Sequence, residues 1–421
     1  MRLGSHAITR LVGNEIQGRD KWSVCVAGRD GWVYGIPWNA RRVVKFNPVD
    51  DTMITIGPDL GSGRYKWQAA VLDEKGFIYC APYFSSHILK IDTNKSKGGI
   101  VTVLDHVEMP EIAGSGWSSG ALALDGFIYF MPAYARHILK LNPKDDTVSS
   151  VGVDLGDGWY KYKGTVIDND GFVYGIPYGS RHIIRFNPVN QAMNLVGEEA
   201  EYDFLCGNGV VGRDGNIYAA ADDGQVLKID VVNNTHYFVG NIVKSSHRHI
   251  GWCSAIVAID GYIYWPPCDA NRTLKFDIET QIASLVGDDF GYAHGKWSCG
   301  AVDSDGVIYR IPRSAAQVLA VDPLKEFEMT LRAEMEQCPE ELGHLFVKNG
   351  SNGKTAYECA VAKFGMEKTM QVIECCILLM AECIDTNTNL YAFMSVASCE
   401  NSALSAIYYL LCDNPTALVN N

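Results

Sequence analysis

The chain has 421 residues, of which 47% are hydrophobic and 20% are charged, so a large core is possible and intrinsic disorder is not expected. It carries 36 Lys and Arg against 49 Asp and Glu. The resulting net charge of −13 argues against a nucleic-acid partner, because binding to the phosphate backbone depends on cationic side chains. No stretch approaches the roughly 20 continuous apolar residues that a membrane-spanning helix needs.

The 13 cysteines are an odd number, and no two of them have CxxC spacing. The first residues contain no apolar run of signal-peptide length. Together these features predict reduced, buried thiols and not a disulfide framework. We therefore expect a protein of the cytoplasm, with the nucleus as the alternative, and no contact with a membrane.

A repeat of about 45 residues occupies the first 330 residues. A Gly that ends a turn is followed three residues later by a Tyr, seven times. The pairs are Gly31 and Tyr34, Gly76 and Tyr79, Gly126 and Tyr129, Gly171 and Tyr174, Gly215 and Tyr218, Gly261 and Tyr264, and Gly306 and Tyr309. Nine residues before the Gly stands Trp22, Trp67, Trp117, Tyr162, Cys206, Trp252 or Trp297. We interpret these aromatic positions as packing residues of a repeated fold.

Each repeat can be read as four short strands, and the third repeat illustrates the pattern. Its strands are expected at 118–124, 127–131, 137–141 and 147–151. An Asp-Gly pair makes the tight turn between the first two strands, because both residues tolerate positive φ. Pro132 ends the second strand, since it cannot donate to a β-ladder. Seven four-stranded units of this length are typical of a β-propeller.

The repeat resembles those of the seven-bladed β-propeller superfamily, which includes WD-repeat, kelch, NHL and streptogramin-lyase-like proteins. Its sequence motifs DGxIYxxP and ILKxDP are similar to those of uncharacterised algal propeller proteins. The resemblance covers about residues 7–330 and implies an all-β domain at 1–330 with four-stranded blades. The segment 8–13 matches the fourth strand of other repeats, such as 193–197, so we expect it to complete the seventh blade and close the ring. The segment 327–331 is a competing fourth strand.

The period changes after residue 330, where Asp-Gly turns vanish and helical patterns begin. Residues 353–365 are similar to an ankyrin unit, and 389–397 with 403–411 resemble a second one. The resemblance implies a small α-helical, ankyrin-like module at 331–421. Two such units are too few to be stable alone, so we expect them to pack on the propeller or on a partner.

Polar and aromatic residues gather in the loops expected on the top face of the propeller. The start of the third strand is polar in every repeat, and three successive repeats place His there. The candidate ligand-binding residues are Trp38, Arg42, Tyr83, His87, Tyr134, Arg136, His137, Tyr178, Arg181, His182 and Arg272. Arg and His can pair with an acidic group while aromatic rings stack beside it. Alternatively, these His and Arg side chains bond only to the carbonyls of neighbouring loops.

Two functions are compatible with this pattern. The first is a non-enzymatic scaffold whose top face and helical tail bind a protein partner or an acidic ligand. The alternative is a lyase or hydrolase that acts on an acidic saccharide or small ligand through the His and Arg ring at the channel mouth. In that case His87, His137 and His182 are the catalytic candidates. No cofactor and no metal site is expected.

Overall fold

In the computed structural model of the chain we describe residues 8–94, 99–110, 116–243, 251–298, 300–323 and 325. The contacts divide the chain into one compact unit at Ile8–Asp322 and a second that combines Met1–Ala7 with Pro323–Asn421. The predicted ankyrin-like helices, and the predicted boundary at residue 330, lie outside the described residues. Within the described residues, no helix is long and apolar enough to cross a membrane.

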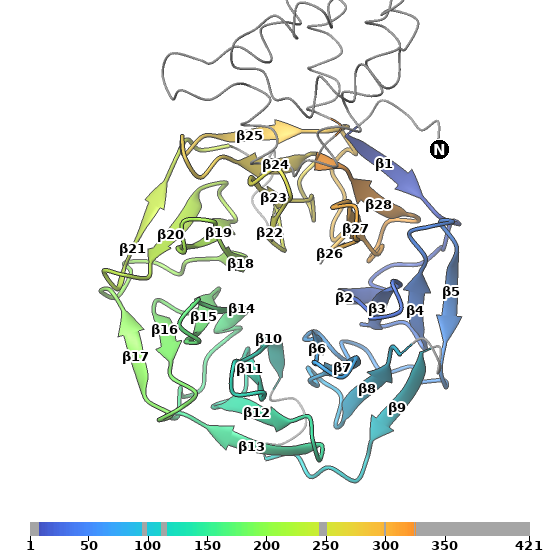
Figure 1. Cartoon of the computed structure of the whole chain (residues 1–421), viewed down its shortest axis with the longest axis horizontal. Helices are drawn as coiled ribbons and strands as arrows, with labels where there is room; N and C mark the ends of the chain where they lie inside the picture. The colour runs from blue at the N-terminus through green and yellow to red at the C-terminus, as the bar shows by residue number, and fades with distance from the viewer. Residues whose placement is uncertain are drawn as a thin grey trace, which may run out of the picture. The chain divides into compact units, whose positions relative to one another are not determined.

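The described residues form seven antiparallel sheets of four strands, arranged in a ring (Figure 1). Blades 1 and 2 are β2 (Trp22–Ala27), β3 (Val33–Pro37), β4 (Val43–Phe46) and β5 (Met53–Ile56), then β6 (Val71–Leu72), β7 (Phe77–Cys80), β8 (Ile88–Asp92) and β9 (Ile100–Leu104). Blades 3 and 4 are β10 (Trp117–Leu122), β11 (Ile128–Pro132), β12 (Ile138–Asn142) and β13 (Thr147–Val151), then β14 (Tyr162–Ile167), β15 (Val173–Pro177), β16 (Ile183–Phe186) and β17 (Met193–Val196). Blades 5 and 6 are β18 (Cys206–Val211), β19 (Ile217–Ala221), β20 (Val226–Asp230) and β21 (Thr235–Val239), then β22 (Ile256–Val257), β23 (Ile263–Trp265), β24 (Thr273–Phe276) and β25 (Ala283–Val286). The prediction of a seven-bladed propeller with four-stranded blades is confirmed.

The seventh blade contains strands from both ends of the propeller. β26 (Ala301–Val302), β27 (Ile308–Arg310) and β28 (Val318–Val321) are followed in the sheet by β1 (Thr9–Val12), which pairs antiparallel with β28 (Figure 1). Thr9 lies opposite Val321, and Val12 lies opposite Val318. The predicted closure by the N-terminal strand is therefore confirmed, and the competing segment 327–331 lies outside the described residues.

The Asp-Gly-x-x-Tyr motif stabilises the turn between the first two strands of a blade. Gly31 adopts φ +85°, a region that side chains with a Cβ rarely enter. The Asp30 carboxylate accepts hydrogen bonds from the Trp32 amide at 3.2 Å and from the Tyr34 hydroxyl at 2.8 Å. The same Asp-to-Tyr bond is present in three further blades, between Asp125 and Tyr129, Asp214 and Tyr218, and Asp260 and Tyr264. Burial and this bond to Asp30 raise the pKa of Tyr34 well above its usual value.

The repeated Trp residues also have a structural role. Each indole N–H donates to the backbone carbonyl of the residue directly before the third strand of the same blade, at 2.8–3.1 Å. These pairs are Trp22 and Arg42, Trp67 and His87, Trp117 and His137, Trp252 and Arg272, and Trp297 and Gln317. A buried indole thus finds the hydrogen-bond partner that it needs, which supports the interpretation of this ring as part of the fold.

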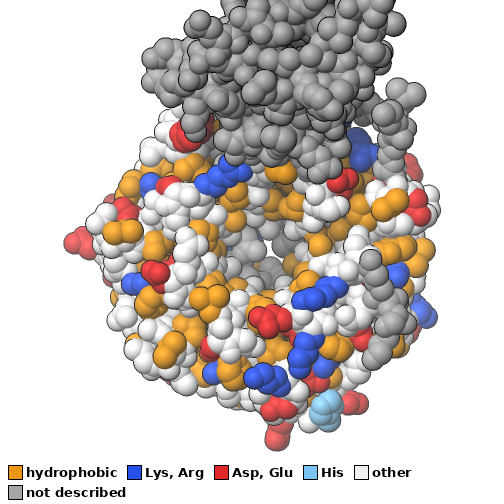
Figure 2. Space-filling view, viewed as in Figure 1, with side chains coloured by type: hydrophobic (Ala, Val, Ile, Leu, Met, Phe, Trp, Pro, Cys, Tyr) orange, Lys and Arg blue, Asp and Glu red, His pale blue; other side chains and the backbone are white. Residues whose placement is uncertain are grey.

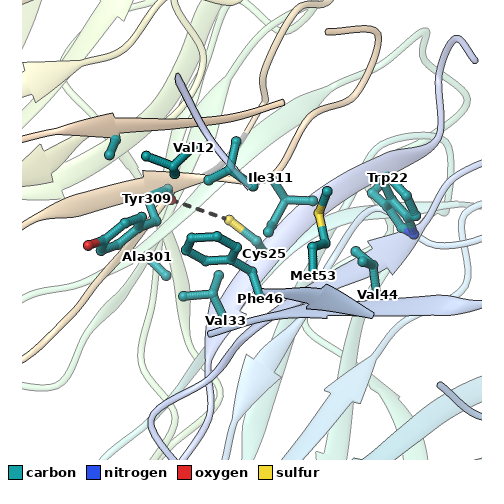
Figure 3. Packing of buried hydrophobic residues seen from close by; sticks show 12 residues of the cluster. Val12, Trp22, Cys25, Val33, Val44, Phe46, Met53, Ala301, Tyr309 and Ile311 are labelled. Carbon is teal, nitrogen blue, oxygen red and sulfur yellow. Dashed lines mark hydrogen bonds between the residues drawn. The ribbon is translucent and has the colours of Figure 1, made fainter. Parts of the chain in front are cut away.

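Hydrophobic side chains fill the space between neighbouring blades. Figure 3 shows the cluster between blades 7 and 1, where Phe46 and Tyr309 lie with ring centroids 5.3 Å apart. Val12 of the closing strand is buried in the same cluster. Burial of apolar surface between consecutive blades is the dominant favourable contribution to such a ring, so the closing strand also contributes to the core.

Candidate functional site

A pocket lies at the centre of the ring, and residues of all seven blades line it. Figure 2 shows one face of the molecule, hollowed at this centre. The innermost strands and the residues that lead into them contribute Ser23, Val24, Gln68, Ala69, Ala70, Ser118, Ser119, Gly120, Lys163, Asn208, Cys253 and Ser298. The loops above them contribute Trp38, Tyr160, Cys268, Asp269, His294 and Arg313. The cavity of about 120 Å³ is several times the space that one water molecule requires, so a small ligand can enter it.

Two positions of the repeat supply half of this lining, nine of the 18 residues. One directly follows the repeated aromatic residue, and the other directly follows the repeated Pro. At the first position, Ser23 and Ser118 donate hydrogen bonds to the carbonyls of Trp67 and Tyr162 in the next blade. Ser298 donates in the same way to a carbonyl of blade 1. Serine at this position therefore connects neighbouring blades.

Four buried polar atoms of the pocket lining have no hydrogen-bond partner among the described residues. They are Trp38 Nε1, Gln68 Oε1, Lys163 Nζ and Asn208 Oδ1. Buried polar groups in folded proteins are nearly always paired, and one left unpaired costs about 1–3 kcal/mol. Donors and acceptors that are unsatisfied together in one cavity are typical of a site that a ligand or water completes.

Positive charge is concentrated in the pocket. The Lys163 ammonium lies 4.7 Å from the centre of the Tyr178 ring, a cation–π contact. Although burial alone lowers its pKa, attraction by Cys253, Tyr160 and Asp222 raises the pKa of Lys163 above its usual value, so this side chain is charged. The Arg313 side chain donates to Asp20 at 2.6 Å, and its guanidinium lies 5.8 Å from the Trp38 ring. Such a site favours an anionic group beside an aromatic wall.

Aromatic rings form one side of the site. Tyr160 packs against Tyr178 at 5.1 Å between ring centroids and against Tyr83 at 6.1 Å, and its hydroxyl accepts a hydrogen bond from Gln68 Nε2. Trp38 lies 5.0 Å from Tyr83. Tyr134 joins the same group, 6.2 Å from Tyr160. The structure therefore brings together the four predicted aromatic residues around the pocket, although only Trp38 of these four is part of the lining.

The loop that carries Tyr160 has a strained backbone conformation, and buried lysine side chains stabilise it. Tyr160 adopts φ +46°, and Tyr65 and Asp20 take the same left-handed conformation at the equivalent position of their blades. Non-glycine residues enter this region at a cost, so neighbouring contacts must hold them there. The next residue in each loop is a buried Lys, and the Lys161 ammonium donates to the carbonyls of Tyr134 and Gly156. Lys21, Lys66 and Lys296 make equivalent bonds.

A paired acid and histidine lie at the same pocket. Asp269 is 1% exposed and accepts hydrogen bonds from the Gly295 amide at 2.6 Å and from His294 Nδ1 at 3.0 Å. The His294 side chain is 69% exposed. A carboxylate that holds Nδ1 leaves the other ring nitrogen to accept a proton, which is the arrangement of a general base. No group of three or more His, Cys, Asp or Glu residues within the described part of the chain is arranged to hold a metal ion.

The predicted His and Arg ring lies elsewhere. The central pocket, as the described residues line it, includes none of Arg42, His87, Arg136, His137, Arg181, His182 or Arg272. These residues lie one or two positions before the third strand of their blade, two strands away from the channel. The predicted binding of a partner or ligand by these residues therefore involves the outer loops and not the central pocket. This binding remains a prediction.

Several of these side chains contact the loop that follows the fourth strand of their blade. Arg136 pairs with Asp154 at 2.7 Å and with Asp157 at 2.9 Å. Arg181 pairs with Glu199 at 3.2 Å, and His182 lies 4.0 Å from the same carboxylate. Arg42 and Arg272 donate to backbone carbonyls, and the His87 ring bonds to the Ser86 hydroxyl. These contacts favour the alternative that the ring holds neighbouring loops in place.

Apart from Trp38, the residues that line the pocket were not selected as candidates from the sequence, although a signal was present. Gln68, Lys163 and Cys253 occupy the position directly after the repeated aromatic residue, where three other blades have Ser. Cys268 and Arg313 occupy the position directly after the repeated Pro. Departures from the repeat at these two positions would have identified much of the site.

No protein-family model matches the chain, and no curated protein is similar to it in sequence. Solved structures nevertheless share its fold. A streptogramin B lyase superposes with a TM-score of 0.61 at 14% identity, over 74% of this chain and 96% of the lyase. A catalytically inactive H270A variant of virginiamycin B lyase from Staphylococcus aureus, with quinupristin, has a TM-score of 0.60 at 10% identity, over 74% of this chain and 98% of that one. Hydrazine synthase of Kuenenia stuttgartiensis has a TM-score of 0.55 at 12% identity, over 73% of this chain and 97% of that one. At these identities the similarity establishes the seven-bladed propeller fold alone.

Proposed function

We propose that the protein binds a small acidic molecule in the central pocket of its propeller. The observation that carries this proposal is the set of four buried polar atoms without a partner among the described residues, which all line one cavity. Concave pockets with an apolar wall and a few convergent polar groups are the usual form of small-ligand sites.

The chemistry of the lining favours one class of ligand. Lys163 and Arg313 suit a carboxylate or a similar anion. Gln68 Oε1 and Asn208 Oδ1 are acceptors, so they require hydroxyl or amino groups on the ligand. Trp38 offers an aromatic surface and an N–H donor. A hydroxylated or amino-bearing acid, such as a carboxylate-bearing sugar, satisfies these groups together.

Binding of a panel of small acids by isothermal titration calorimetry tests this function. We expect Lys163→Met to weaken binding at least about tenfold, since it removes the charge that pairs with the anion, and tenfold corresponds to about 1.4 kcal/mol. Lys144→Met removes the same charge from an exposed turn and is the matched control. Equal affinity in both variants would refute the assignment of the pocket.

A second candidate function is catalysis at the same pocket. The pairing of His294 with buried Asp269 supports it, because this histidine could remove a proton from a bound acid. Among proteins of this fold, the virginiamycin B lyase loses its activity in the H270A variant. A lyase or hydrolase would convert a bound acid at a rate that His294→Ala abolishes while binding persists. Absence of turnover for every acid that binds would contradict this candidate.

A protein partner on the outer loops is also part of the proposal. The predicted scaffold surface consists of Arg42, His87, Arg136, His137, Arg181, His182 and Arg272, with Tyr83, Tyr134 and Tyr178 beside it. An ankyrin-like helical module at 331–421 would offer a second contact surface, and a cytoplasmic location would suit the reduced thiols. Capture of a partner from lysate by the wild type, and its loss from a triple alanine variant of His87, His137 and His182 that still folds, would support this role.

A further inference from the structure

Two free cysteines line the central pocket side by side. Cys253 follows Trp252, Cys268 follows Pro267, and Trp252 pairs with Pro267 across neighbouring strands of blade 6. The two thiols lie close enough for each to shift the pKa of the other. Cys253 is 8% exposed and Cys268 is 2% exposed, so only a molecule small enough to enter the pocket reaches them. They are the described cysteines that line this cavity, since Cys25, Cys80 and Cys206 do not.

Cationic side chains surround the pair. Lys163 and Arg313 line the same pocket. Arg310 lies fully buried and donates hydrogen bonds to the carbonyls of Ser298 and of Ser254, the residue after Cys253. Arg310 is also the one charged residue at its position of the repeat, where the other blades have Gly35, Cys80, Phe130, Gly175, Ala219 and Trp265. These two bonds hold the Arg310 guanidinium beside Cys253, where its charge favours a thiolate.

The two thiols differ in acidity. The hydrogen bond that Cys268 donates, together with the charges of Lys163, Arg310 and Arg313, lowers the pKa of Cys253 despite its burial. The same bond and burial raise the pKa of Cys268, which stays protonated. By contrast, burial raises the pKa of both Cys80 and Cys206. The thiolate is the nucleophilic form of cysteine.

We propose that Cys253 forms a covalent adduct with a small electrophile that carries an anionic group, with Cys268 as its hydrogen-bond donor. This inference rests on the proposed function, because the same cationic pocket selects the acidic molecule. With an α-halo acid, the Cys253 sulfur uses its electron pair to form a bond to the α-carbon. The carbon–halogen bond breaks, and halide leaves with its electron pair. No proton is transferred, since the sulfur is already ionised.

Alkylation of the full-length protein with iodoacetate and iodoacetamide tests the proposal. The two reagents are nearly the same size and differ in charge. Peptide mass spectrometry follows Cys253, Cys268, Cys80 and Cys206, and glutathione is the reference thiol. We expect Cys253 to react at least about tenfold faster than Cys80 or Cys206, because those thiols stay protonated. We also expect its ratio of iodoacetate rate to iodoacetamide rate to exceed that of glutathione by about tenfold, because Lys163 attracts the carboxylate.

Substitutions of Cys268 and Lys163 measure how much each residue contributes to the alkylation rate of Cys253. Cys268→Ala removes the donor and should slow alkylation of Cys253, while Cys268→Ser retains a donor and should react nearly as the wild type does. Lys163→Met should lower the iodoacetate rate more than the iodoacetamide rate. Circular dichroism and thermal unfolding confirm that each variant folds. Reaction of Cys253 no faster than Cys80 and Cys206, or with the charge preference of glutathione, would overturn the proposal.

Failure of this inference can be distinguished from failure of the proposed function. Calorimetry of non-electrophilic acids with Cys253→Ser measures reversible binding without the thiol. Binding by this variant, with an unreactive Cys253 in the wild type, overturns the covalent step and leaves the acid-binding function intact. Absence of acid binding in the wild type overturns the proposed function and, with it, the selection of anionic electrophiles.

Discussion

Two lysines at the start of β14 should respond differently to the same substitution. Lys161 and Lys163 are two residues apart, and both side chains are largely removed from solvent. The Lys161 ammonium donates to the carbonyls of Tyr134 and Gly156, whereas Lys163 Nζ has no hydrogen-bond partner among the described residues. We predict that Lys161→Met destabilises the protein and that Lys163→Met leaves its stability nearly unchanged.

The magnitudes follow from these contacts. A buried donor without a partner costs about 1–3 kcal/mol, and removing Lys163 recovers that amount. The substitution also loses the contact with the Tyr178 ring, about 1 kcal/mol, and the attraction to Cys253 and Asp222, so the net change should stay within about 1 kcal/mol. Hydrogen bonds to a charged group contribute about 1.5–3 kcal/mol each, so Lys161→Met should cost at least about 2 kcal/mol.

Urea unfolding followed by tryptophan fluorescence measures both free energies of unfolding, with thermal unfolding as a second readout. The cost of about 2 kcal/mol in Lys161→Met should lower the melting temperature by roughly 4–8 °C. The Lys163→Met protein should keep its stability but bind acids more weakly, because Lys163 supplies the charge that pairs with the anion. Destabilisation by Lys163→Met of more than about 1 kcal/mol would refute the reasoning and make Lys163 a structural residue.

Three further predictions concern the fold itself. Tyr129→Phe removes the 2.8 Å hydrogen bond to Asp125 and should lower the free energy of unfolding by about 1 kcal/mol in urea titrations. An unchanged value would show that the repeated Asp-to-Tyr bond adds no net stability. Leu11→Pro should lower the free energy of unfolding by at least about 3 kcal/mol, because proline disrupts the pairing of β1 with β28. The control Leu11→Ala alters a 45% exposed side chain and should change it by less than about 1 kcal/mol. Similar melting temperatures of the two variants would argue against closure by this strand. Burial lowers the pKa of Lys21 from 10.5 to about 8, so the unfolded chain binds more protons between these values and stability should rise with pH from about 8 to 10. Lys21→Met should remove that part of the rise, and identical pH profiles of the two proteins would contradict the shift.

Much of the fold could be predicted because its determinants are local and repeated. The Asp30 carboxylate bonds to Tyr34 four residues later, and Gly31 supplies the positive φ of the turn between them. A proline such as Pro37 closes the second strand a few residues further on. These contacts recur wherever the spacing recurs, so seven copies of the spacing predict seven blades. Closure by the 8–13 segment followed from the same logic, since it carries the pattern of a fourth strand.

The candidate site could be predicted only in part. The aromatic residues Trp38, Tyr83, Tyr134 and Tyr178 were selected from the sequence, and they do gather around the pocket. The His and Arg residues were selected because their position is polar in every repeat and was expected on the top face near the channel. The structure places that position two strands from the channel, where Arg136 and Arg181 pair with carboxylates of the loop that follows the fourth strand of their blade. A polar residue at a repeated position therefore did not by itself indicate the ligand site.

The sequence by itself determined the strands, the turns and the number of blades, because neighbours within about ten residues make those contacts. Only the tertiary structure brought Gln68, Lys163 and Asn208 together, since they belong to three different blades and meet solely because the ring closes. The pairing of Asp269 with His294 and the proximity of Cys253 to Cys268 arise in the same way, from loops and strands that converge on the channel. Their chemistry depends on a shared, buried environment, and burial at the centre of the ring is a property of the assembled propeller and not of any single repeat.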